Sequence, residues 1–155
     1  MFREMLSRDA SMSFEVFPPK KNDEFDNCYN VLDSLAKLNP DFISVTYGAG
    51  GSRSKKTVEI ASYIQNTLKI DAMAHMTCVG SSEDDILEVT KDLEASGVSH
   101  VLALRGDKPR DMSDEQFAKR IFPHATDLIR FLNTNTNLDV SAACYPEKHP
   151  EAMSI

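Results

Sequence analysis

Two carboxylates, Glu15 and Asp107, stand where the sequence pattern could put them to chemical use. Glu15 lies inside a short β-rich run, and period-two alternation places it on one face of a strand. If that face looks into an enclosed site, its carboxyl group is a candidate general acid. Asp107 follows Gly106 in a tight turn, where a glycine lets the backbone approach a ligand closely. Two plainer alternatives stay open: Glu15 could face solvent, and Asp107 could be an ordinary turn residue.

The other polar motifs give weaker signals. The glycine cluster at 46–51 lacks both the Gly-x-Gly-x-x-Gly spacing and the Gly-Lys-Ser/Thr ending of nucleotide-binding loops. His75 and His149 lack the short helical spacing of metal-binding signatures, and no matched carboxylate lies nearby in sequence. Each histidine is therefore interpreted as a hydrogen-bonding residue, and no metal site is predicted.

The three cysteines leave one rival enzyme hypothesis. They are an odd number and widely spaced, with no Cys-x-x-Cys pair, so they are expected to be reduced and mostly buried. A Cys-based hydrolase would use Cys78 or Cys144 as nucleophile and His75 or His149 as base. Both thiols are expected inside strands, which disfavours this reading.

Short apolar runs alternate with longer segments of helical period, which predicts βα units and a parallel sheet. Strands are expected at 13–17, 42–47, 72–79, 100–104 and 139–145. Helices are expected at about 22–38, 54–68 and 83–96, and within 114–133, where Pro123 separates two halves.

Polar residues near the carboxyl ends of the strands distinguish a barrel from a doubly wound sheet. They are Glu15, Thr46, His75, Thr77, Arg105, Asp107 and Tyr145. Barrel enzymes gather functional residues from several strands at that one rim. The predicted fold is α/β, a partial (β/α)8 TIM barrel of about five parallel strands in sequence order with flanking helices.

Charge and hydropathy exclude some partners. The 155 residues carry a formal net charge of −7, which disfavours binding to nucleic acid or to an anionic membrane. No apolar run approaches the roughly 18 residues that span a bilayer, and the N-terminus has no signal-peptide pattern. A cytoplasmic protein is expected.

Five motifs in order resemble those of the methylenetetrahydrofolate reductases. They are SFEVFPPK at 13–20, VTYGAGG at 45–51, HMTC at 75–78, LRGDKP at 104–109 and AACYPEKHPEA at 142–152. The resemblance implies a flavin-bearing barrel in one-carbon metabolism and methionine biosynthesis. It implies reduction of 5,10-methylenetetrahydrofolate to 5-methyltetrahydrofolate through FAD, with NADH or NADPH as reductant.

The same resemblance assigns roles to residues. Glu15 matches the family's catalytic proton donor, and Asp107 matches the aspartate near the flavin and the folate. Thr46 matches a position that lines the nicotinamide site. Arg105 would suit an anionic group through charge-assisted hydrogen bonds. The implied FAD contacts are Tyr47, Ala49, His75, Arg105, Gly106, Asp107, Ala125, Tyr145, His149 and Ala152. Ala125 rests on matching residues 124–129 to Tyr-Ala-x-Asp-Leu-Val, from which His124 departs.

Length is the departure from the family pattern, because a full barrel needs about 200 to 250 residues. Residues 1–155 are therefore expected to form a single, truncated domain, the N-terminal part of the barrel, whose own activity stays open. Such a piece should expose an apolar interior face and self-associate through open edges, as a homo-oligomer. The alternative is a non-enzymatic binding or assembly module derived from the barrel.

Overall fold

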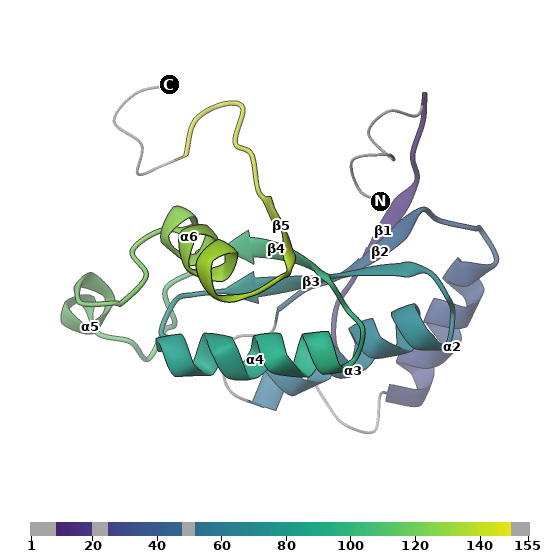
Figure 1. Cartoon of the computed structure of the whole chain (residues 1–155), viewed down its shortest axis with the longest axis horizontal. Helices are drawn as coiled ribbons and strands as arrows, with labels where there is room; N and C mark the ends of the chain where they lie inside the picture. The colour runs from purple at the N-terminus through teal and green to yellow at the C-terminus, as the bar shows by residue number, and fades with distance from the viewer. Residues whose placement is uncertain (1–8, 20–24, 48–51, 150–155) are drawn as a thin grey trace.

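The computed structural model describes residues 9–19, 25–47 and 52–149, in which strands alternate with helices (Figure 1). The strands are β1 Ser13–Val16, β2 Phe42–Val45, β3 Asp71–Thr77, β4 His100–Leu104 and β5 Asp139–Ala142. The helices are α2 Phe25–Ala36, α3 Ser52–Asn66, α4 Glu83–Ala95, α5 Asp114–Ala118 and α6 Ala125–Asn135.

The five strands form one parallel sheet in the order β1-β2-β3-β4-β5. The order never reverses its direction of winding, as it would in a doubly wound sheet. β1 and β5 are its two edges, so the sheet is not closed. The predicted partial barrel of parallel strands in sequence order is confirmed.

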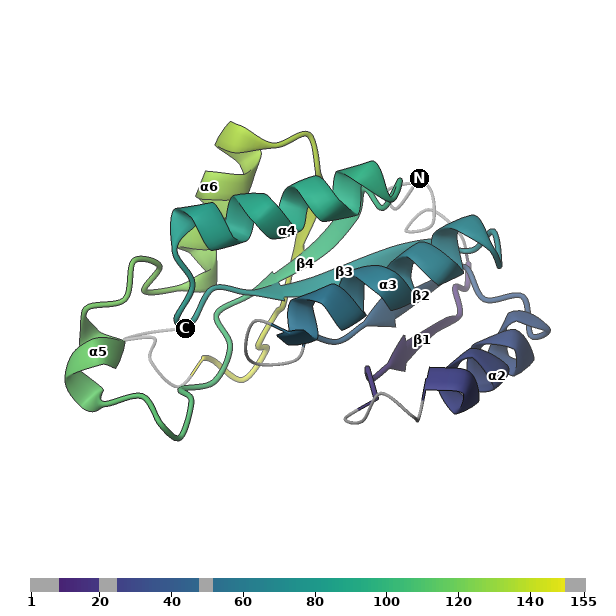
Figure 2. The same cartoon turned by 90° about the horizontal axis from the view of Figure 1, so that it is seen from below.

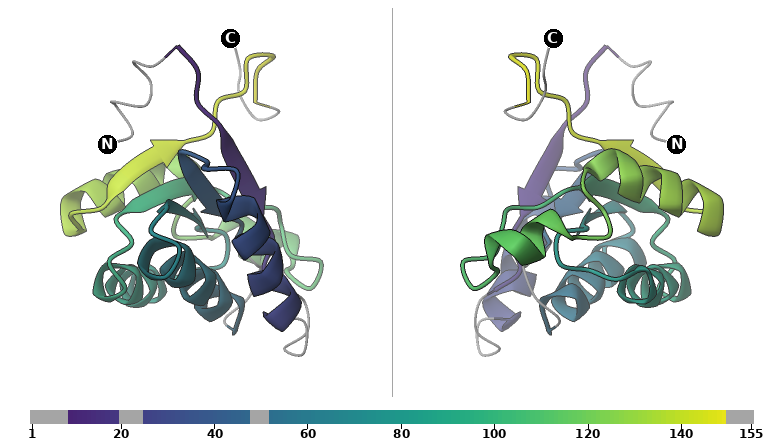
Figure 3. Two further views of the ribbon diagram at one scale, coloured as in Figure 1. Left: turned by 90° about the vertical axis from the view of Figure 1, so that its right-hand side faces the viewer. Right: turned by 90° about the vertical axis from the view of Figure 1, so that its left-hand side faces the viewer.

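The helices lie on one side of the sheet (Figures 2 and 3). α3 packs mainly on β3 and β2, and α6 packs on β4 and β5. No described helix covers the opposite face (Figure 3). Among the described residues, no helix is long and apolar enough to cross a membrane.

Strand alternation separates an apolar face from a mixed face. The helix-side residues are fully or almost fully buried and form the core with the helices: Ile43, Val45, Ala72, Ala74, Met76, Val101 and Ala103. The opposite face carries Ser13, Glu15, Ser44, Met73, His75, Thr77, His100 and Leu102. The expectation of an apolar interior face is therefore wrong, because polar side chains alternate into it.

Local signals in the sequence explain where the helices begin and end. Ser82 caps α4, since its Oγ accepts a hydrogen bond from the Asp85 backbone N–H at 3.1 Å and its own N–H donates to Asp85 Oδ2. Gly97 follows α4 with φ 72°, the left-handed conformation that ends many helices. Pro123 lies between α5 and α6, as predicted.

Four strands end earlier than the sequence suggested. β1 stops at residue 16, β2 at 45, β3 at 77 and β5 at 142, although the expected runs reached 17, 47, 79 and 145. At β2, the Thr46 N–H still donates to the Val16 carbonyl at 2.9 Å, but the Thr46 carbonyl accepts from Thr57 Oγ1 of α3 instead of continuing the ladder. A side-chain bond from a helix thus turns the chain away from the sheet.

Candidate functional site

A cavity of about 740 Å³ opens where the carboxyl ends of β2 to β5 meet. Parallel strands bring all these ends to one edge of the sheet, which is where α/β proteins place their ligands. The first turn of α6 and the segment after β5 close it on one side. The site therefore lies at the rim that the polar residues predicted.

Nine sequence-predicted residues line this cavity. They are Thr46 and Tyr47 after β2, His75 in β3, Arg105, Gly106 and Asp107 after β4, Ala125 at the start of α6, and Tyr145 and His149 after β5. Ala49 and Ala152 lie outside the described residues. Chain segments up to about a hundred residues apart thus converge on one hollow.

Glu15 lies at the border of this cavity and lines a second hollow of about 520 Å³ between β1 and α2. Its Oε2 is 3.5 Å from Nε2 of His75. The Glu15 side chain is 51% exposed, so the described residues do not enclose it in the low-dielectric site that the sequence suggested. Among them, His75 connects Glu15 to the larger cavity.

His75 is the buried ionisable group of the cavity, with a relative exposure of 7%. Burial lowers the pKa of its imidazole below the ordinary 6.5, and the Glu15 carboxylate partly opposes that shift by raising it. Nε2 has no hydrogen-bond partner among the described residues. A buried nitrogen in this state is available to a ligand or to a neighbouring side chain.

The turn after β4 depends on Gly106. Its φ is +83°, and a Cβ at this position would lie 2.8 Å from Val79 Cγ1 and 2.9 Å from Thr77 Cβ. A glycine is therefore required for the turn to pack against the end of β3. Arg105 donates from Nε to the Gly106 carbonyl at 3.1 Å, and its guanidinium carbon lies 5.8 Å from the Phe117 ring centre.

Cys78 ties the end of β3 to two loops of the site. Its buried Sγ lies 3.7 Å from the Arg105 carbonyl oxygen and 3.8 Å from those of Phe122 and His124. Burial raises the pKa of this thiol to about 11. A protonated thiol facing three carbonyl oxygens is a weak donor and a poor nucleophile, which disfavours the Cys-based hydrolase.

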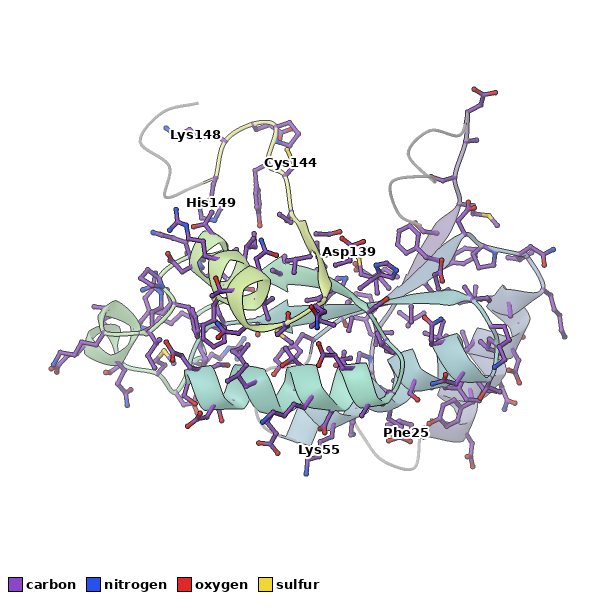
Figure 4. The ribbon with its side chains drawn as sticks, viewed as in Figure 1. Phe25, Lys55, Asp139, Cys144, Lys148 and His149 are labelled. Carbon is purple, nitrogen blue, oxygen red and sulfur yellow. The ribbon has the colours of Figure 1, made fainter. Side chains whose placement is uncertain are left out.

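Cys144 corrects the expectation for the remaining cysteines. It is exposed, two residues beyond the end of β5, and Cys28 is half-buried. Only Cys78 is buried, so the prediction of mostly buried thiols is wrong. Figure 4 shows Cys144 on the segment beyond β5, at some distance from His149 on the same segment.

The N-terminus of α6 faces the cavity through Ala125, Thr126 and Ile129. The His124 N–H donates to Asp127 Oδ2 at 2.9 Å, so part of this helix end is already capped. The rings of Tyr145 and His149, which line the same cavity, meet edge to face with centroids 5.1 Å apart.

The sequence missed some lining residues as site candidates. They include Val79, Leu104, Thr126, Ile129, Ala142 and Ala143. Thr126 and Ile129 adjoin the predicted Ala125 within one turn of helix, so helical period could have found them. The alanines and aliphatic residues carry no chemical signal of their own. Among the described residues, no group of three or more His, Cys, Asp or Glu could hold a metal.

Solved structures resemble this fold. A 4-hydroxy-tetrahydrodipicolinate synthase from Methylacidiphilum fumariolicum SolV matches with a TM-score of 0.58 at 15% identity, over 90% of this chain and 46% of that one. A dihydrodipicolinate synthase from Agrobacterium tumefaciens matches with a TM-score of 0.57 at 16% identity, over 89% and 46%. At such low identity these neighbours support the partial-barrel fold alone.

Relatives with similar sequences are more informative about the family. The 5,10-methylenetetrahydrofolate reductase of Pectobacterium carotovorum is 36% identical over 96% of this chain and 48% of that protein. That of Escherichia coli K12 is 35% identical over 93% and 47%, and the Arabidopsis thaliana methylenetetrahydrofolate reductase (NADH) 1 is 34% identical over 93% and 25%.

The chain spans about half the length of these bacterial relatives and 25% of the plant relative. The sequence model of the methylenetetrahydrofolate reductases matches residues 2–155, almost the whole chain. The strand order and the grouping of the motif residues agree with that match. This chain belongs to the methylenetetrahydrofolate reductase family.

Proposed function

We propose that this chain supplies the flavin-facing half of an enzyme that reduces 5,10-methylenetetrahydrofolate to 5-methyltetrahydrofolate, with FAD and a reduced nicotinamide nucleotide. The observation that carries the proposal is the convergence of nine sequence-predicted residues on one cavity, around a buried imidazole nitrogen that has no hydrogen-bond partner among the described residues. The family supports the reaction, because its bacterial members are named for it.

The cavity residues fit a flavin by their chemistry. Gly106 leaves room that a Cβ would fill, so the backbone of its turn can lie close to a bound ring. Arg105 brings a guanidinium to the same wall, which suits a phosphate. The first turn of α6 adds a helix N-terminus, which favours the same negative charge. When bound there, the flavin would supply hydride transfer.

Glu15 is the proposed proton donor. Its carboxyl group would deliver a proton from Oε2 to the ring nitrogen that leaves as the five-membered ring of the folate opens. The half-exposed side chain is accessible to a substrate from the helix-free side of the sheet. This position leaves the carboxyl group able to reach both the folate and the imidazole of His75.

Asp107 has a different proposed role from Glu15. It is exposed at the mouth of the cavity, two residues beyond Arg105. A carboxylate there would accept hydrogen bonds from the folate pterin and would set the local charge near the flavin. Thr46, which also lines the cavity, is the proposed contact of the nicotinamide. The name of the Arabidopsis relative favours NADH as the reductant.

The test is an absorbance spectrum of the purified protein, followed by anaerobic addition of NADH and NADPH in turn. The proposal predicts bound flavin that one of the two nucleotides bleaches and 5,10-methylenetetrahydrofolate restores. A protein that stays colourless after incubation with FAD would favour the non-enzymatic module instead. Because the chain covers about half the length of its bacterial relatives, the measurement is made on this chain and on a version extended to their full length, called the complete polypeptide below.

A further inference from the structure

Glu15 and His75 point to the same side of the sheet from strands that are not neighbours. Glu15 on β1 pairs in register with Ser44 on β2, which pairs with Met73 on β3. His75 lies two residues farther along β3, on the same face as Met73. In a tilted barrel sheet, side chains from alternate strands meet in one layer, and these two residues share such a layer.

The two side chains differ in how the protein holds them. His75 is buried and its Nε2 has no described hydrogen-bond partner, whereas the Glu15 side chain is half-exposed. Their separation of 3.5 Å is longer than a well-formed hydrogen bond, and a small rotation of the exposed Glu15 side chain would close it. Leaving a buried nitrogen unpaired costs free energy, so the folded protein favours that closure.

We propose that His75 is the positioning residue of Glu15, holding its carboxyl group at the edge of the cavity and returning a proton to it after each turnover. This inference rests on the proposed function for the role of Glu15 as proton donor. It adds a partner for that donor.

The proton account of the pair is simple. When Glu15 carries the proton, its O–H donates to the unprotonated Nε2 of a neutral His75. When Glu15 transfers the proton to the substrate nitrogen, an O–H bond breaks and an N–H bond forms. A hydronium ion of the solvent then protonates Nε2, its O–H bond breaking to leave water, and the Nε2–H bond breaks as the Glu15 O–H bond forms again. No electrons move between the two residues, so the pair needs no oxidant or reductant.

Other ionisable groups line the cavity and could also shift the pKa of His75. They come from each element packed around it: Tyr47 after β2, Arg105 and Asp107 after β4, His124 before α6, and Tyr145 and His149 after β5. Glu15 is nevertheless the charged group that shifts the His75 pKa, in the upward direction. Leu102, the β4 residue paired with His75, does not titrate, and neither does Thr46, which follows the last residue of β2.

A second histidine provides a matched control. His100 Nδ1 lies 3.4 Å from Asp139 Oδ2 at the other end of the same face. Burial lowers the pKa of His100 and Asp139 raises it, as Glu15 does for His75. The two pairs therefore have similar separations and separate partners, and Asp71 also raises the pKa of His100.

The experiment is an NMR titration of the ¹⁵N-labelled chain, with the ring nitrogens of its four histidines followed through pH. His75→Gln identifies the His75 signals. Glu15→Gln should lower the His75 midpoint, because it removes the carboxylate that raises the His75 pKa, and leave the His100 midpoint unchanged. Asp139→Asn should lower the titration midpoint of His100 and leave that of His75 unchanged. If Glu15→Gln does not fold, Glu15→Ala removes the same charge from a half-exposed position.

An unchanged His75 midpoint in Glu15→Gln would overturn the pairing. A second readout uses the complete flavin-loaded polypeptide, in which the pH profile of folate reduction should lose one limb in His75→Gln. A mere contact between His75 and the cofactor would scale the rate down and keep the shape of the profile. If the wild type reduced no folate, the proposed function would fail while the NMR coupling still stood, so the two failures are distinguishable.

Discussion

Gly106 lies so close to Thr77 that a methyl group on Gly106 would come within 2.9 Å of the Thr77 Cβ atom. The contact joins the turn after β4 to the end of β3, and both sides of it belong to the cavity. The shape of the site is thus set by backbone packing as much as by the side chains that line it.

Gly106→Ala should therefore weaken the fold and the site together. The left-handed φ and the clash should lower the free energy of unfolding by about 2 to 4 kcal/mol, and flavin affinity should fall. Gly97→Ala is the matched control, since Gly97 has φ +72° but its nearest atom to an added Cβ is 3.7 Å away. It should cost about 1 to 2 kcal/mol and leave flavin binding unchanged. If urea unfolding gave equal losses of unfolding free energy for Gly106→Ala and Gly97→Ala, the clash at Gly106 would have been relieved by movement of its neighbours.

Two histidines, the buried His75 and the partly buried His100, make stability depend on pH. Burial lowers the pKa of both His75 and His100 below 6.5 in the folded chain. The unfolded chain then binds more protons than the folded chain below about pH 6.5, so stability should fall as the pH drops from 7.5 to 5.5. Carboxylates with a lowered pKa, such as Asp85, also stabilise the folded chain, but that stability is lost only at lower pH, around and below the ordinary Asp85 pKa of 3.8.

Urea unfolding at pH 7.5 and 5.5 measures this effect. The loss of stability between the two pH values should shrink in the double variant His75→Gln, His100→Gln. A wild type that is equally stable at both values would contradict the burial of these imidazoles.

The cysteines should differ widely in reactivity toward a thiol reagent at pH 7. Cys144 is exposed and should react fast, whereas Cys78 is buried with a pKa raised to about 11 and should react only on unfolding. Cys28, half-buried with a raised pKa, should react at an intermediate rate. Mass spectrometry of the labelled peptides gives the order, and early labelling of Cys78 would place its side chain elsewhere.

The open edges of the sheet should lead to self-association. β1 and β5 each pair on one side only, and Val31 on α2 is 47% exposed beside the hollow next to β1. Sedimentation velocity should show oligomers of the chain that grow with concentration and are reduced in Val31→Lys. Ile121→Lys, at a position that is 56% exposed and not on that hollow, should leave association unchanged. A monomer at every concentration would contradict this prediction.

The sequence predicts the strand order well because βα period and turn residues are local signals. Pro123 correctly separated α5 from α6, and β4 runs from His100 to Leu104 as expected. The end of β5 was missed, since the apolar run to Tyr145 reads as strand while pairing with β4 stops at Ala142. Hydropathy alone does not reveal where a neighbouring strand stops.

The sequence predicted which residues line the candidate site better than it predicted how they are arranged there. Motif residues such as His75 and Arg105 carry polar groups that stand out in apolar runs. The approach of Glu15 to His75 could not be read from the sequence, because it depends on how three strands are staggered. Likewise, nothing in the sequence near Cys78 predicts that its thiol lies against the backbone carbonyls of Arg105, Phe122 and His124.

The central claim is that Glu15 donates the proton in folate reduction, and half-reactions of the complete flavin-loaded polypeptide test it most directly. Glu15→Gln should slow the oxidation of reduced flavin by 5,10-methylenetetrahydrofolate by about 10²-fold or more, since a general acid contributes about that much. Reduction of the flavin by NADH or NADPH needs no such proton and should proceed at close to the wild-type rate. An equal loss in both half-reactions would contradict the account and give Glu15 a structural role.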